Sequence, residues 1–206
     1  MKIYFVRHGE TENFVNNLEQ DENSGLSDNG IKQAKALAQR FKNIPIDFIL
    51  TSPYQRARET AEIINKEIDK KIIVNKLLRE TKKPTEIENK PHHASEIKEI
   101  RQLLYEHFGD PNWRYSDEEN FFDLKKRGTK ILKYLTDLKY ENILVVSHGT
   151  IIRMIFALMM FGEDFSWKEF SAIQEFFGFG NTGISIAVKG GHRIWKMEAW
   201  NDTTHL

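Results

Sequence analysis

The sequence predicts an α/β fold, a three-layer α/β/α sandwich in which helices cover both faces of a mostly parallel central sheet. Short apolar runs typical of buried strands alternate along the chain with longer segments whose apolar residues recur at helical spacing. That alternation is typical of strand–helix–strand units, whose strands lie parallel. The length of 206 residues suits one compact domain. We therefore expect a single domain over residues 1–206.

In the first half of the chain, strands are expected at 2–6, 46–50 and 71–75. Helices are expected between them, over 26–41 and 51–68. The first helix follows Ser27 and Asp28, which are both good N-cap residues. For the second helix, Ser52 is a candidate cap and Pro53 suits the first turn.

The regular alternation loosens over residues 81–120. The stretch TKKPTEIENKP at 81–91 is polar and contains two prolines, and a helix is expected after it, over 92–108. This part of the chain is too short to fold alone. We interpret it as an insertion that forms a lid over a site.

The last third of the chain returns to the α/β pattern. Helices are expected over 117–138 and 148–161, and a buried strand over 142–147. Two closing strands, at 182–189 and 192–200, are separated by a Gly-Gly pair and predict a hairpin.

Composition excludes several classes of function. The 30 basic and 30 acidic residues give a net charge of zero, which gives no support to nucleic-acid or anionic-membrane binding. There is no cysteine, so disulfides and thiolate chemistry are excluded. The most apolar run, 151–161, is shorter than the roughly 20 residues that span a membrane. We expect a cytoplasmic protein, and the oligomeric state stays open.

Charged side chains follow the expected strands at the point where each strand ends. Arg7 and His8 follow the first strand, and Arg56 lies early in the helix after the second. Glu80 follows the third strand, and His148 follows the strand at 142–147. Taken singly, each has an ordinary structural explanation. Because ligands of such sheets bind beyond the carboxyl ends of the strands, we expect these residues to share one site.

Such a cluster contains the parts needed for phosphoryl transfer. Two guanidiniums suit phosphate oxygens, and nearby cations keep an imidazole neutral and nucleophilic near pH 7. A second imidazole can donate to the transferring group. A carboxylate can protonate a leaving alkoxide and then deprotonate water. These are the elements of a reaction through a phosphohistidine.

A metal site is the competing interpretation of His8, His148 and Glu80. Two arginines beside them would repel a divalent cation, and the sequence contains no HxxxH or HExxH spacing. We therefore expect no metal.

The chain resembles the histidine phosphatase superfamily, which includes the cofactor-dependent phosphoglycerate mutases. The resemblance spans nearly the whole chain in the family's order. It is carried by RHGET at 7–11, LSDNGIKQA at 26–34, TSPYQRARETA at 51–61, LLRE at 77–80, VVSHGTIIR at 145–153, NTGISI at 181–186 and WNDTTHL at 200–206.

The resemblance implies a role for each charged residue. It makes His8 the phosphorylated nucleophile and Glu80 the proton donor. Arg7, Arg56 and His148 become the phosphate pocket. No metal or organic cofactor is required, and the expected partner is a small phosphorylated substrate.

Several neighbouring positions take their interpretation from the same resemblance. Arg56 is favoured over Arg58 because the family's arginine precedes the position of Ala57. Gly149, like Gly9, would let the backbone approach a phosphate closely.

Two features of this sequence depart from the family pattern. Many relatives carry a Trp-Asn pair after the first motif, with the Asn on phosphate. Here Asn13 and Phe14 stand in those places, so either Asn13 or Asn16 is the candidate contact. The Gly-x-Trp-Glu-Gly element that often follows the glutamate is also absent, which leaves the substrate open.

Three functions are compatible with these residues. The segment between Glu80 and His148 is short for a true mutase, which favours a phosphomonoester hydrolase of small metabolites. Mutase activity is the alternative. It would need cations on the lid to meet a second anionic group, although these can equally be solvated charges: Lys82, Lys83, Lys90, His92 and His93. A phospho-ligand or phosphoprotein binding module is less favoured, because binding alone needs neither a nucleophile nor an acid.

Overall fold

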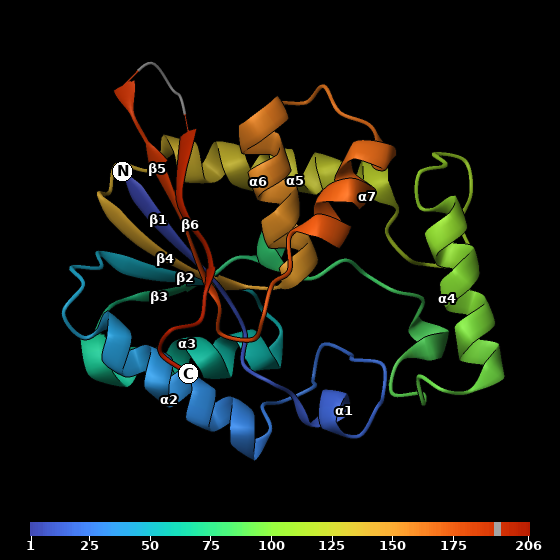
Figure 1. Cartoon of the computed structure of the whole chain (residues 1–206), viewed down its shortest axis with the longest axis horizontal. Helices are drawn as coiled ribbons and strands as arrows, with labels where there is room; N and C mark the ends of the chain where they lie inside the picture. The colour runs from blue at the N-terminus through green and yellow to red at the C-terminus, as the bar shows by residue number, and fades with distance from the viewer. Residues whose placement is uncertain (192–194) are drawn as a thin grey trace.

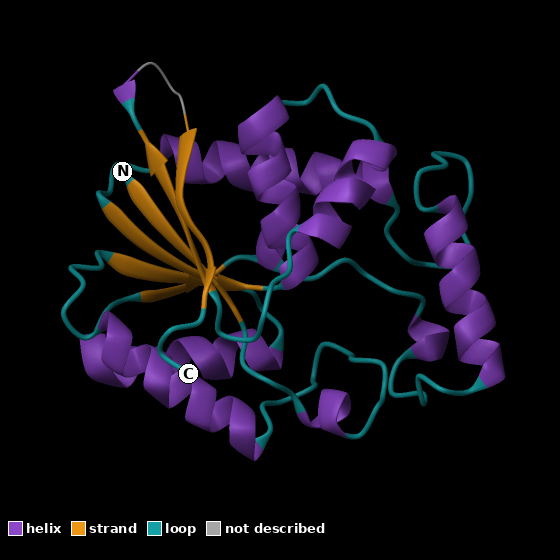
Figure 2. Ribbon diagram, viewed as in Figure 1, coloured by secondary structure: helices purple, strands orange, loops and turns teal. Residues whose placement is uncertain are grey.

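A six-stranded sheet lies between two layers of helices in the computed structural model, which describes residues 1–191 and 195–206 (Figures 1 and 2). The strands are β1 (Lys2–Arg7), β2 (Phe48–Thr51), β3 (Ile72–Val74), β4 (Asn142–Ser147), β5 (Ile184–Lys189) and β6 (Trp195–Asp202). Their order across the sheet is β3-β2-β4-β1-β5-β6. The first four strands in this order are mutually parallel. Strand β5 pairs antiparallel with β1, and β6 pairs antiparallel with β5. The predicted α/β fold with a mostly parallel sheet is confirmed.

The closing hairpin is confirmed by the antiparallel pairing of β5 with β6. Residues 192–194, which the sequence assigned to the second strand of the hairpin, lie outside the described residues.

The long helices agree with those predicted from the sequence, whereas several short helices were not predicted. They are α1 (Glu12–Val15), α2 (Asp28–Phe41), α3 (Gln55–Ile68), α4 (Ser95–His107), α5 (Phe121–Asp137), α6 (Gly149–Phe161) and α7 (Trp167–Phe176). Two short 3₁₀ helices are η1 (Lys76–Leu78) and η2 (Thr85–Ile87). The sequence predicted neither α1 and α7 nor the 3₁₀ turns. None of the helices in the described part of the chain combines the length and hydropathy of a membrane-spanning segment.

Capping residues explain where the helices begin. Ser27 caps α2 by accepting a hydrogen bond from the Gly30 amide at 3.0 Å, as predicted. The cap predicted at Ser52 is wrong, because α3 begins only at Gln55 and the Ser52 hydroxyl is directed elsewhere. Helix α5 starts at 121 rather than 117, since Asn120 forms a capping box there.

Each face of the sheet carries its own apolar core. Alternation along β1 sends Ile3 and Phe5 to one face and Tyr4 and Val6 to the other. The first face packs against α5, α6 and α7, and the second against α2 and α3 (Figure 1). All these side chains are buried, so the sheet is held rigidly from both sides.

Residues 81–120 lie beside this sandwich and have a small apolar cluster of their own. Ile87 from η2 packs with Ile97 and Ile100 from α4. Figure 1 shows α4 standing apart from the sheet, at the side of the molecule where β1 ends. The segment is also tied to the loop after α1 through a bridge between Leu18 and Pro91.

The chain leaving β1 crosses the first turn of α2 at very short range. A Cβ on Gly30 would lie 2.0 Å from the Glu10 carbonyl oxygen, and one on Gly9 would lie 2.7 Å from the Gly30 carbonyl oxygen. Both glycines therefore serve this backbone crossing. It provides a packing reason for Gly9, which the sequence had linked to phosphate.

We expect Gly30→Ala to lower the free energy of unfolding by about 1–3 kcal/mol, because backbone atoms must move to accept the methyl group. Urea denaturation measures the change. Gly178→Ala is the matched control, since a Cβ at that position meets nothing within 4 Å. Equal effects of the two substitutions would contradict the close crossing.

Candidate active site

The register between β1 and β4 brings the two strand-end histidines together. Arg7 pairs with Ser147 across the two parallel strands, so His8 and His148 are the next residues on each. The His8 amide continues the ladder by donating to the Ser147 carbonyl at 3.0 Å. The two imidazole rings lie 5.1 Å apart between centroids, tilted by 59°.

A cavity of about 230 Å³ opens at this edge of the sheet. The predicted residues Arg7, His8, Arg56 and Glu80 all line it. His148 is fully buried against the His8 ring. The other lining residues are Glu19, Gln20, Asp21, Glu22, Tyr54, Thr81, Lys82, Lys83, Glu88, His92 and Thr150.

Hydrogen bonding fixes which nitrogen of His8 can react. Nδ1 lies 2.7 Å from the Gly9 carbonyl oxygen, which can only accept, so Nδ1 carries the proton. Nε2 then has the lone pair, and it accepts a hydrogen bond from Nε of Arg56 at 3.3 Å. The nitrogen beside the guanidinium is therefore the one with a lone pair.

His148 has one ring nitrogen engaged and one without a partner. Nε2 lies 2.7 Å from the oxygen of the Ser52 hydroxyl, which accepts from the Tyr54 amide at 3.3 Å and has its own proton to donate to Nε2. Nδ1 is buried and has no hydrogen-bond partner among the described residues. A buried polar atom of this kind is costly unless a ligand satisfies it.

Both histidines are held neutral. Burial, followed by the charges of Arg56 and Arg7, lowers the pKa of His8 well below its usual range. Burial and the charge of Arg56 do the same to the pKa of His148. Near neutral pH, therefore, His8 has a free lone pair rather than a proton on Nε2.

Backbone carbonyls position the two arginines. Arg56 donates from Nη1 to the Asp21 carbonyl at 2.7 Å and lies over the Tyr54 ring, 5.0 Å from its centroid. Arg7 donates from Nη1 to the Phe179 carbonyl, and its Nε is buried without a hydrogen-bond partner in the part of the chain that the structure describes. Burial lowers the pKa of Arg56 to about 10, so it stays charged at neutral pH. Two cations with unused donors thus face one cavity.

Glu80 is held by the start of α6. Its carboxylate accepts from the Thr150 amide at 3.1 Å and from the Ile151 amide at 3.3 Å. Arg127 of α5 donates to the carbonyls of Leu77 and Arg79 at 2.9 and 2.7 Å. The Arg127 guanidinium is itself paired with buried Glu119. The residues leading to Glu80 are therefore fixed to the helical layer.

Two further residues of the site were not singled out from the sequence. Tyr54 lines the cavity, and its ring lies 5.2 Å from that of His148. Arg153 donates from Nε to the Phe177 carbonyl at 2.8 Å, and its Nη1 would lie 3.0 Å from a Cβ on Gly149. Gly149 thus makes room for an arginine one helical turn on. Their i, i+4 spacing was the available signal for Arg153.

The structure places Asn13 outside the cavity lining. Its amide donates to the Glu19 carbonyl at 3.0 Å and to the Asn89 side chain at 2.7 Å. It thereby joins the loop after α1 to the 81–120 segment. Asn16 is exposed and is also absent from the lining. Of the two candidate arginines of α3, Arg56 lines the cavity and Arg58 is exposed.

Buried Glu19 lies beside Lys83, His92 and Arg101 of the 81–120 segment. Its carboxylate lies 2.5 Å from Nζ of Lys83, 3.5 Å from Nε2 of His92 and 3.5 Å from Nη1 of Arg101. These groups are paired with the protein rather than free for a second anion. Among the described residues, no group of three or more His, Asp or Glu side chains is arranged to hold a metal ion.

Comparisons with known proteins agree with this geometry. Residues 3–203 match the family model described as "Histidine phosphatase superfamily (branch 1)". A probable phosphoglycerate mutase, GpmB, of Photorhabdus laumondii is 34% identical over 152 residues, which is 72% of this chain and 70% of that protein. A putative phosphoserine phosphatase 2 of Hydrogenobacter thermophilus is 28% identical over 77% of this chain and 78% of its own.

A solved structure shares the whole fold. It is a mutant phosphoserine phosphatase of Entamoeba histolytica in complex with phosphoserine, and it superposes with a TM-score of 0.78 at 26% identity. The superposition covers 100% of this chain and 98% of that one. The likeness thus includes the 81–120 segment as well as the sheet.

The depressed histidine pKa values predict how stability depends on pH. Each folded-state pKa lies below the ordinary value of 6.5, so the unfolded chain binds more protons once the pH falls below that value. The contribution is fully present above about pH 6.5 and is lost as the pH falls. We expect stability to fall as the pH drops below about 6.5, with a slope that approaches about 1.4 kcal/mol per pH unit for each histidine.

Urea denaturation at a series of pH values measures this slope. The double variant His8→Asn/His148→Asn should remove it, and each single variant should remove about half. A double variant with the wild-type slope would show that these two rings are not its source.

Proposed function

Because the chain belongs to the histidine phosphatase superfamily, we propose that it hydrolyses phosphomonoesters through a phosphohistidine on His8. The observation that carries the proposal is the tautomer of His8, with Nδ1–H donated to the Gly9 carbonyl and Nε2 directed toward Arg56. The family and its named relatives support a phosphatase or a mutase. The phosphohistidine and the choice of hydrolysis are our proposal.

In the first step, Nε2 of His8 attacks phosphorus in line with the leaving oxygen. The P–N bond forms as the P–O bond to the alcohol breaks, and Glu80 gives its proton to that oxygen. The Gly9 carbonyl, 2.7 Å from Nδ1, stabilises the positive charge that develops on the ring. Arg7, Arg56 and His148 stabilise the transferring phosphoryl group, for which the unpaired Nε of Arg7 and Nδ1 of His148 are suited.

In the second step, water attacks the phosphohistidine. Glu80 takes the proton of that water, the P–N bond breaks, and phosphate leaves with His8 neutral again. Glu80 can serve both steps because backbone amides of α6 hold it beside the nucleophile. Neither step needs a metal or an organic cofactor. Asn13 would act only indirectly, by holding Glu19 and its loop in place.

The charges of the 81–120 segment favour hydrolysis over mutase activity. A mutase must hold a second anionic group, but Lys82 is paired with Asp117 at 2.5 Å and Lys83 with Glu19 at 2.5 Å. Lys82, Lys83, Glu88 and His92 also line the cavity, which supports this segment as the lid of a small-metabolite site. A pure binding module would have no use for the paired nucleophile and acid.

Phosphate release with a chelator present tests the proposal. Wild-type protein should hydrolyse phosphomonoesters, and His8→Ala should lower the rate by at least about 10³-fold, since the nucleophile is removed. A labelled phosphoenzyme that is stable in alkali and labile in acid should form only with His8 present. His107→Ala, on the outlying helix α4, is the control. Conversion of 3-phosphoglycerate to its 2-isomer without phosphate release would favour the mutase instead.

The role of Glu80 predicts a dependence on the leaving group. Glu80→Gln should slow hydrolysis of an alkyl phosphate by roughly 10²–10⁴-fold and that of p-nitrophenyl phosphate much less, because nitrophenolate leaves without a proton. The kcat/KM values of the two esters give the comparison, because they report phosphoryl transfer to His8 and not the later hydrolysis of the phosphohistidine, with exposed Glu12→Gln as control. An equal loss on both esters would remove Glu80 from the acid role.

A further inference from the structure

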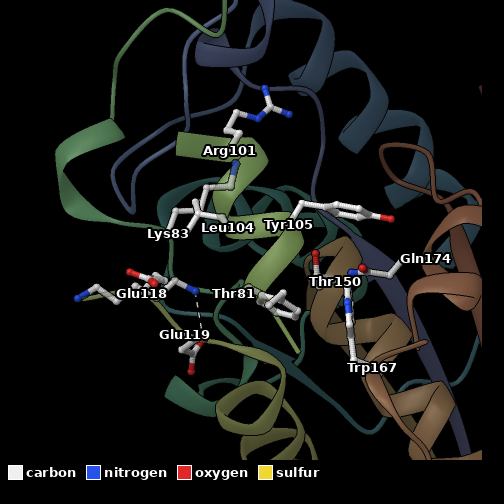
Figure 3. A pocket seen from close by; sticks show the side chains of 12 residues that line it. Thr81, Lys83, Arg101, Leu104, Tyr105, Glu118, Glu119, Thr150, Trp167 and Gln174 are labelled. Carbon is white, nitrogen blue, oxygen red and sulfur yellow. Dashed lines mark hydrogen bonds between the residues drawn. The ribbon is translucent and has the colours of Figure 1, made fainter. Parts of the chain in front are cut away.

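A second cavity of about 280 Å³ adjoins the catalytic one (Figure 3). The two share Thr81, Lys82, Lys83 and Thr150 in their linings. Two of these residues flank the proposed acid, because Thr81 follows Glu80 in the chain and the Thr150 amide donates to its carboxylate. The second cavity therefore begins where the alcohol of a substrate would leave.

Opposite walls of the second cavity come from α4 and α7. Figure 3 shows Leu104 and Tyr105 reaching it from α4, and Trp167 and Gln174 from α7. Phe108 completes the wall, with its ring 4.9 Å from that of Trp167. The walls that α4 and α7 contribute are thus mainly aromatic or aliphatic.

The charged residues of this lining are all paired with other parts of the protein. Lys82 binds Asp117, and Lys83 and Arg101 lie against the Glu19 carboxylate. Glu119 pairs with Arg127 at 2.6 Å. The remaining acid, Glu118, accepts from the amides of Tyr115 and Ser116 at 2.6 and 2.8 Å. Each cation of this lining therefore has a carboxylate beside it, which offsets its attraction for an anionic ligand.

Neutral groups supply the remaining polarity at the mouth. The Thr81 hydroxyl is buried and has no hydrogen-bond partner among the described residues. The Thr150 hydroxyl and the Gln174 amide also line the space. These groups can bind hydroxyl, ether or amide functions close to the leaving oxygen.

We propose that the second cavity receives the alcohol part of the substrate, and that this alcohol is uncharged and carries an aromatic or similarly flat apolar ring. The inference rests on the proposed hydrolysis at His8 and adds the class of leaving group. It separates this protein from an enzyme for alcohols that carry a carboxylate, such as serine or glycerate, because carboxylates of the protein already offset the charge of the cations in this cavity.

Three esters of alkyl alcohols test the proposal: ethyl phosphate, 3-phenylpropyl phosphate and phosphoserine. We expect kcat/KM for 3-phenylpropyl phosphate to exceed that for each of the others by at least about ten-fold, mainly through a lower KM, because only its ring buries apolar surface in the second cavity. A rate constant for phosphoserine equal to or above that of the phenyl ester would overturn the inference, as would equality with ethyl phosphate.

Filling the cavity tests where the preference arises. Leu104→Trp should lower the ratio of kcat/KM for 3-phenylpropyl phosphate to that for ethyl phosphate by about ten-fold, and Gln174→Trp should do so from the opposite wall. Leu103→Trp is the matched control, since Leu103 is the neighbouring residue on α4, 40% exposed and outside the cavity lining. An unchanged ratio in both filled variants would overturn the proposal.

Binding distinguishes a failure of this inference from a failure of the proposed function. If no ester is hydrolysed, calorimetry with 3-phenylpropyl phosphate and inorganic phosphate on wild-type protein still reports the second cavity. Tighter binding of the phenyl ester, weakened by Leu104→Trp, would support the inference even as hydrolysis failed. If 3-phenylpropyl phosphate bound no more tightly than inorganic phosphate, the inference would be overturned.

Discussion

The in-register parallel pairing of β1 with β4 is the constraint on which the site depends. Arg7 and Ser147 end the paired strands together, so the residues after them, His8 and His148, must emerge side by side. No loop has to bring these two rings together. The antiparallel β5 closes the other side of β1 and carries the chain past the same edge, where the Thr182 amide donates to the Arg7 carbonyl at 3.0 Å. Strand geometry that is buried on both faces therefore sets the distance between the two histidines.

Burial then gives these groups their chemistry. An imidazole placed at the edge of a dry sheet beside Arg7 and Arg56 stays neutral, and a guanidinium in the same place needs acceptors that are themselves uncharged. The carbonyls of Asp21 and Phe179 provide them, so each arginine keeps its charge and directs unused donors into the cavity. Carboxylates in place of these two carbonyls would have offset the positive charge of the arginines and weakened their attraction for an anion.

Sequence reasoning was accurate where the signal is local or periodic. The strands stood out as short apolar runs, and the motif residues followed from their positions at strand ends. Helix α7 was missed although Ser166 and Glu169 form a capping box, because its aromatic residues masked the helical period. Asn13 is attached to Glu19 and Asn89, and Glu19 is paired with Lys83 of the 81–120 segment. These contacts join polar loops that are distant in sequence, for which no periodicity exists.

Glu80 lies at the boundary between the α/β sandwich and the 81–120 segment. It is the residue before the 81–120 segment, yet its carboxylate is anchored on α6, which belongs to the core. Insertions, deletions or substitutions beyond Thr81 can therefore change the part of the cavity wall that the 81–120 segment supplies, while Glu80 keeps its place on α6. Sequence change in the 81–120 segment can therefore alter the shape of the cavity while His8, Arg56 and Glu80 keep their positions, which lets the ligand of the site diverge without loss of its charged groups.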